Sequence, residues 1–158
     1  MKKQPKTKTR SSKTTKELVN DSMNDTWQSM YAVTEHWQSD LKFFFDEVSF
    51  FRILIDKYFI WLVEKKNVTV ARELISELTT FEKKRIELEY EVAAHLSYLS
   101  NLILEPFTQN RQKASGEHAT LEQAVAEYVK GFRALKNKVF SFTKKMIDLE
   151  KVHHLLTP

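Results

Sequence analysis

Residues 27–62 read WQSMYAVTEHWQSDLKFFFDEVSFFRILIDKYFIWL, and this stretch decides the fold. Mostly apolar side chains recur in it at alternating spacings of three and four residues. That alternation is the ~3.5-residue period of a helix that packs along its whole length. The members of this first stripe are Trp27, Met30, Thr34, Trp37, Leu41, Phe44, Val48, Phe51, Ile55, Tyr58 and Leu62. The stretch contains neither glycine nor proline, so the pattern predicts one long helix.

Two further stripes with the same alternation follow along the chain. The second stripe consists of Ala71, Leu74, Leu78, Phe81, Arg85, Leu88, Val92, His95, Leu99 and Leu102. The third stripe consists of Leu121, Val125, Tyr128, Phe132, Leu135, Val139, Phe142, Met146, Leu149, His153 and Leu156. Three stripes of this kind predict an all-α protein, an elongated antiparallel bundle of three long helices with coiled-coil-like packing.

Capping and helix-breaking residues set the expected ends of the helices. Thr14 with Glu17 is one of two capping-box-like starts for the first helix, which is expected to begin between residues 15 and 25. Asn67 is expected to cap the end of that helix in a short turn. A long loop is predicted at 105–119, which contains a proline and a glycine. The predicted helices are about 20–66, 69–104 and 120–156.

The formal charge of +4 is unevenly distributed along the chain of 158 residues. Of the 25 Lys and Arg residues, seven precede Glu17, the first of the 21 Asp and Glu residues, so 18 remain and the rest of the chain is mildly acidic. Residues 1–16 have almost no apolar content and are predicted to form a disordered basic arm ahead of a single helical domain, 17–158. The arm could contact nucleic acid or an anionic membrane, but it lacks interleaved aromatic residues, which favours a solubilising tail. Its basic residues are Lys2, Lys3, Lys6, Lys8, Arg10, Lys13 and Lys16.

Composition and motifs exclude several classes of protein. The chain has no cysteine, so it has no disulfide framework, no thiolate zinc site and no cysteine nucleophile. Its most apolar stretch, 43–63, contains five charged residues, which argues against a membrane span. There is no glycine-rich phosphate loop, no Gly-x-Ser-x-Gly and no His-Glu-x-x-His, so no enzyme activity, cofactor or small-molecule substrate is predicted. A cytoplasmic location is expected, because no apolar signal core follows the basic N-terminus.

The first helix has more apolar surface than a three-helix core needs. A second stripe, about 100° around the helix from the first, consists of Phe43, Phe50, Leu54 and Trp61. Self-association into a homo-oligomer is the expected way of covering it, and protein–protein interaction is therefore the predicted role. Two alternatives stay open: other segments of the same chain cover the stripe, or it contacts a lipid surface.

Two histidines and two carboxylates could meet near one end of the bundle. His36 and Asp40 are four residues apart on the first helix, and Glu91 and His95 are four apart on the second. A short turn near Asn67 would set Asp40 opposite His95, and the set could bind a divalent metal. A ferritin-like site needs Glu-x-x-His on each of two helices, and the sequence has one such spacing.

The preferred prediction is therefore a buried polar pair that fixes helix register in a bundle without a metal. The protein is predicted to be a non-catalytic helical interaction or structural protein that self-associates through its aromatic-rich first helix. The alternatives are a metal-binding bundle, and a nucleic-acid or membrane-surface accessory protein that acts through the basic arm.

Overall fold

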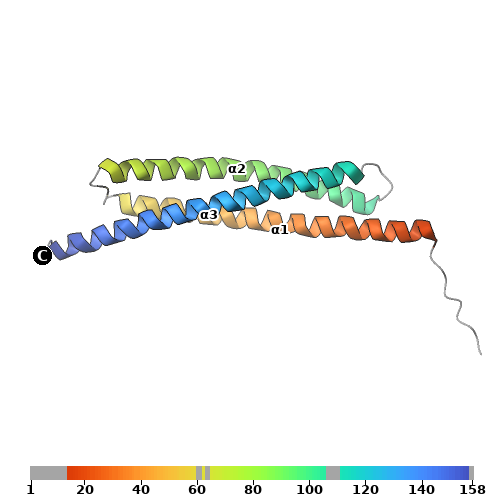
Figure 1. The fold of residues 1–158 in the computed structure, drawn as a ribbon, viewed down its shortest axis with the longest axis horizontal. Coiled ribbons are helices and arrows are strands. Elements are labelled where there is room, and N and C mark those ends of the chain that lie inside the picture. The colour runs from red at the N-terminus through yellow and green to blue at the C-terminus, as the bar shows by residue number, and fades with distance from the viewer. Residues whose placement is uncertain (1–13, 60–61, 63–64, 106–110, 157–158) are drawn as a thin grey trace, which may run out of the picture.

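The structure, a computed structural model, describes residues 14–59, 62, 65–105 and 111–156. Three long helices run along one another: α1 (Thr15–Tyr58), α2 (Lys65–Leu104) and α3 (Arg111–Leu156). α2 runs antiparallel to both other helices, so α1 and α3 point the same way (Figure 1). The described residues contain no strand. The predicted all-α bundle of three long antiparallel helices is confirmed.

α1 begins at the earlier of the two predicted starts. The backbone N–H of Glu17 donates to the Thr14 hydroxyl at 3.4 Å, and the backbone N–H of Thr14 donates to the Glu17 carboxylate at 2.7 Å. This reciprocal capping box satisfies two donors at the helix start. Thr15 and Lys16 are therefore helical, and the prediction that placed them in a disordered arm is wrong. The rest of the predicted arm, residues 1–13, lies outside the described residues.

The connection between α1 and α2 lies earlier in the chain than the sequence predicts. α1 ends at Tyr58 rather than near residue 66, and α2 begins at Lys65 rather than at 69. Asn67, predicted to cap α1, is buried in the first turn of α2, where its side-chain oxygen accepts a hydrogen bond from Lys145 at 2.7 Å. The side chain of Asn67 therefore binds Lys145 of α3 and does not cap the end of α1.

α3 begins at Arg111, so the predicted loop at 105–119 is wrong from residue 111 onward. The glycine in this segment costs the helix about 1 kcal/mol relative to alanine. Ala114, however, is fully buried and packs with Trp27, Leu99 and Leu102 in a small core cluster at this end of the bundle. Burial against α1 and α2 offsets the weak local helix propensity, because most helical stability in proteins comes from tertiary packing.

The three apolar stripes meet along the bundle axis and form the main core. Its middle is aromatic: Phe51 stacks on Phe132 with ring centroids 5.8 Å apart, and Phe81 packs against Tyr128 at 5.5 Å. α1 and α2 make the most extensive contact, whereas α1 and α3 make the least. α3 lies at an angle to the other two helices in Figure 1. A large part of α1 therefore faces away from the core.

The ends of the bundle are staggered. The first turns of α1 project at one end, and the last turns of α3 project at the other (Figure 1). Leu18 and Val19 of α1 are exposed there, as are Leu155 and Leu156 of α3. The two ends of the described chain are therefore separated by the whole length of the molecule.

Candidate functional site

The outer face of α1, turned away from the core, carries large apolar side chains that are more than half exposed. The exposed fraction is 57% for Phe43, 51% for Phe50 and 63% for Ile53. These residues are seven and three positions apart, so they follow one line along the helix. Val48 and Phe51, which are buried, lie on the opposite side of the same turns. The helix is thus apolar on two sides, and only one of them faces the core.

The exposed line continues in both directions with polar residues. We call it the outer seam, and it consists of Ser39, Phe43, Asp46, Phe50, Ile53 and Lys57. All six residues are exposed, and their spacing alternates between four and three. This ~3.5-residue period is that of a coiled-coil contact. α1 therefore carries one such stripe toward its own core and a second toward solvent.

The outer seam includes only part of the predicted interaction surface. Phe43 and Phe50 are exposed as expected. Leu54 is half-buried and packs against the main core, and Trp61 lies outside the described residues. The sequence prediction did not include Ile53, because it continued the stripe from Phe50 to Leu54, four residues on, instead of to Ile53, three residues on. The alternating spacing itself is readable from the sequence.

Other exposed aromatic side chains beside the seam have partners on neighbouring helices. The guanidinium of Arg85 on α2 lies over the ring of Phe45, 5.0 Å from its centroid. Phe140 on α3 meets the ring of Phe51 edge-on at 5.7 Å. These contacts cover the two flanks of α1 with residues of the same chain.

The aromatic rings of the outer seam lack such partners in the described part of the chain. Phe43 contacts the ring of its sequence neighbour Phe44 at 6.0 Å, and Phe50 contacts that of Phe51 at 6.3 Å. No ring contact from α2 or α3 reaches either residue among those the structure describes. The apolar surface of the seam therefore stays available to another molecule.

The structure does not assemble the predicted metal set. His36 and Glu91 are exposed, Asp40 is half-buried and His95 is buried. Among the described residues, no three His, Cys, Asp or Glu side chains lie close enough together to hold a metal ion. The physical reason is the helix period: His36 and Glu91 each lie one position from a core residue and turn away from the axis. The structure therefore does not bring the four predicted residues together as a metal site.

His95 instead pairs with a histidine of α3. Its Nε2 lies 3.1 Å from Nδ1 of His118, and the ring of Trp37 on α1 stacks on His118 with centroids 4.8 Å apart. Burial lowers the pKa of His95, and the neighbouring His118 lowers it further; burial also lowers the pKa of His118. The sequence prediction missed His118 because it placed residues 105–119 in a loop. The bundle does contain a polar pair, buried at His95 and half-buried at its partner, which is His118 and not Asp40.

Open pockets lie between α2 and α3 at both ends of the bundle. The pocket next to the histidine pair has a volume of about 730 Å³, and His95, Tyr98 and Glu117 are among its lining residues. At Gly116, which also lines it, an added Cβ would meet nothing within 4 Å. The pocket is therefore a shallow, open recess beside the buried pair.

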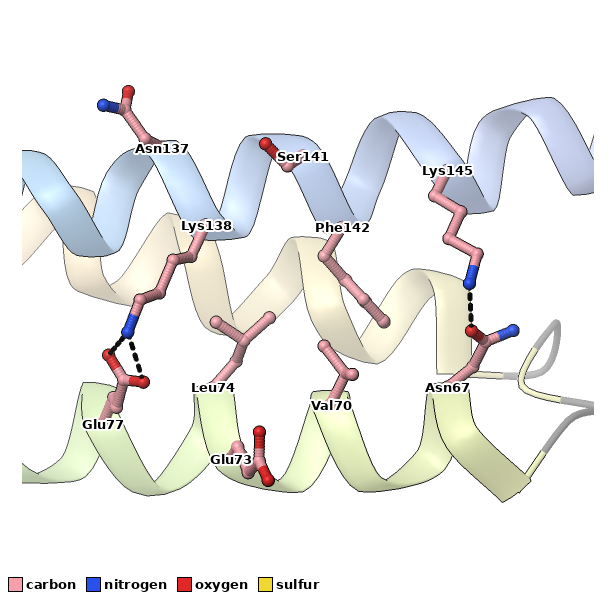
Figure 2. A pocket seen from close by; sticks show the side chains of 10 residues that line it. All are labelled: Asn67, Val70, Glu73, Leu74, Glu77, Asn137, Lys138, Ser141, Phe142 and Lys145. Carbon is pink, nitrogen blue, oxygen red and sulfur yellow. Dashed lines mark hydrogen bonds and ion pairs between the residues drawn. The ribbon is translucent and has the colours of Figure 1, made fainter.

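Figure 2 shows the pocket at the other end, which has a volume of about 540 Å³. Its two lysines are bound within the chain: Lys138 contacts both carboxylate oxygens of Glu77 at 2.8 and 2.9 Å, and Lys145 donates to Asn67. Apolar side chains, including Phe142, lie between these polar contacts (Figure 2). These contacts tie α2 to α3, which is a structural role.

Only one basic residue of the predicted arm lies within the described residues. Lys16 lies in the first turn of α1, whereas the other six basic residues of the predicted arm lie within residues 1–13, outside the described residues. None of the helices in the described part of the chain has a stretch long and apolar enough to cross a membrane.

Comparison with known proteins adds no family. The chain matches no protein-family model, no curated protein and no solved structure. The candidate site is the outer seam of α1, where exposed apolar side chains follow one line along the helix.

Proposed function

We propose that this protein is a non-catalytic helical interaction protein that self-associates through the outer seam of α1. The observation that carries the proposal is the exposure of Phe43, Phe50 and Ile53 along one line at the coiled-coil period. Isolated exposed apolar residues are ordinary on protein surfaces, but an ordered line of them is typical of an interface. Most soluble homo-oligomers have closed symmetry, so a dimer is the simplest assembly.

The energetics of burial support this role. Fully burying a phenylalanine or isoleucine side chain contributes about 1.5–3 kcal/mol, and more than half of Phe43, Phe50 and Ile53 is still exposed. A two-fold contact buries every such residue twice, once on each copy. Because the seams of both copies have the same ~3.5-residue period, the side chains of one seam can pack between those of the other.

The test compares the native chain with F43Q/F50Q, because glutamine is a good helix former and leaves α1 intact. We expect the native protein to be a dimer at micromolar concentration, and the double variant to associate at least about 100-fold more weakly. I86Q is the matched control, since Ile86 is an exposed apolar residue on α2. Light scattering measures the mass, and circular dichroism verifies that all three proteins keep their helix content.

Two results would contradict the proposal. One is a monomeric native protein at tens of micromolar. The other is an F43Q/F50Q variant that associates as strongly as the native chain and the I86Q control.

A further inference from the structure

We infer that the outer seams of two copies pair antiparallel, in the register that sets Phe50 of one copy against Ile53 of the other and Asp46 against Lys57. The inference rests on the proposed self-association and adds its geometry. It follows from the position of two opposite charges, one on each side of the apolar centre of the seam.

The heptad pattern of the seam favours this pairing. In heptad notation, Phe50 and Lys57 are a positions. Asp46, which precedes Phe50, and Ile53, which lies between Phe50 and Lys57, are d positions. In an antiparallel pair of helices, a positions of one helix lie opposite d positions of the other. One two-fold axis beside Phe51 therefore brings the apolar pair and the charged pair into register together.

Other arrangements of the same two seams are less favourable. A parallel pair in register stacks Asp46 on Asp46 and Lys57 on Lys57, so like charges meet. An antiparallel pair shifted by one heptad sets Asp46 against Phe50, or Ile53 against Lys57, and a charge then loses water without gaining a partner. The inferred register avoids both penalties, which makes the seam selective for a second copy of itself.

Both charges are available for this contact. Asp46 and Lys57 are exposed, and neither forms an ion pair with another described residue. The ammonium of Lys57 lies 5.2 Å from the ring centroid of Tyr58, which holds it near the helix surface. Glu47, which flanks the seam, already pairs with Lys136 of α3. The carboxylate of Glu47 is therefore already neutralised by a residue of its own chain.

The pairing has a consequence for the shape of the dimer. Each α1 lies between its own core and the partner's α1, so the dimer is a six-helix assembly with the two α1 helices at its centre. At ~1.5 Å per residue, the N-terminal ends of the two α1 helices lie on the order of 100 Å apart.

The test exchanges the two charges. D46K alone and K57D alone each place like charges opposite one another at two symmetric sites, and each is expected to weaken self-association by about tenfold or more. An equimolar mixture of D46K and K57D restores both attractions, and its dissociation constant should lie within about threefold of the native value. The double variant D46K/K57D should recover in the same way. D25K is the matched control, because Asp25 is an exposed acidic residue of α1 off the seam.

Sedimentation velocity on these samples separates this inference from the proposed function. If F43Q/F50Q weakens association but D46K and K57D behave like the native chain, the register is overturned and self-association through the seam stands. If D46K binds the native chain more tightly than the native chain binds itself, the pairing is parallel and the inference is overturned. If the native chain is a monomer, both are overturned.

A disulfide test checks the same register without placing like charges opposite one another. The chain has no cysteine, so D46C/K57C introduces the only two thiols. In the inferred register each thiol faces its counterpart on the other copy, and mild oxidation should yield a covalent dimer. D46C alone is the control: its two thiols would lie roughly 16 Å apart along the axis, too far to join. Equal cross-linking of D46C and D46C/K57C, or none in either, would contradict the register.

Discussion

His95 Nε2 lies 3.1 Å from His118 Nδ1, and this hydrogen bond joins α2 to α3. One nitrogen donates and the other accepts, so the two rings cannot both be charged. His95 is buried, and its Nδ1 has no partner among the described residues. The pair is therefore a polar contact inside the bundle that carries at most one positive charge.

Stability should fall as the pH is lowered through the ordinary range of histidine. Burial lowers both histidine pKa values below the ordinary 6.5, so the unfolded chain takes up these protons at higher pH than the folded one. The contribution of the neutral histidines to the free energy of unfolding is complete above about pH 6.5 and decreases as the pH falls below it. Urea unfolding at pH 7.5, 6.5 and 5.5 measures the effect. H95L/H118L should flatten this part of the profile, and an unchanged slope would show that other groups cause it.

Metal ions should not stabilise the native protein. His95 binds His118, and the described residues bring no third His, Cys, Asp or Glu close enough to complete a site. Equimolar Zn²⁺, Mn²⁺ or Fe²⁺ should therefore leave the melting temperature unchanged, since only binding to the folded state raises it. A rise that disappears in both H36L and H95L would instead support the metal-binding alternative.

The two glycines of α3 should respond oppositely to alanine. An added Cβ at Gly116 meets open space, so G116A should gain about 0.5–1 kcal/mol of unfolding free energy from helix propensity. At Gly131 the Cβ would lie 2.9 Å from Cζ of Phe81, whose ring is packed against Tyr128 and Phe132. Overpacking there should outweigh the propensity gain, and G131A should lose about 1 kcal/mol. Urea denaturation of both variants at pH 7.5 tests this; equal stabilisation would mean that Phe81 moves freely.

The fold was predictable because each helix repeats one simple pattern many times. The core residues Leu41, Phe51 and Ile55 belong to the predicted first stripe, and all three are fully buried. The ends of the helices were less predictable, because they depend on contacts with residues far away in the sequence. Asn67 binds Lys145, and Ala114 is buried by residues of α1 and α2.

The site was only partly predictable for the same reason. Phe43 and Phe50 could be identified from periodicity alone. His118 could not, since its role depends on α3 starting earlier than its composition suggests. Arg85 interrupts the apolar stripe of α2, and only the structure shows that its charge is paired with Glu82 and Glu89.

The native mass of the purified, unmodified protein tests the central claim most directly, because it reports subunit number and retained metal together. Self-association through the outer seam predicts a species of twice the mass of one chain, with no stoichiometric metal, at low micromolar concentration. A species with the mass of a single chain at tens of micromolar would contradict the account.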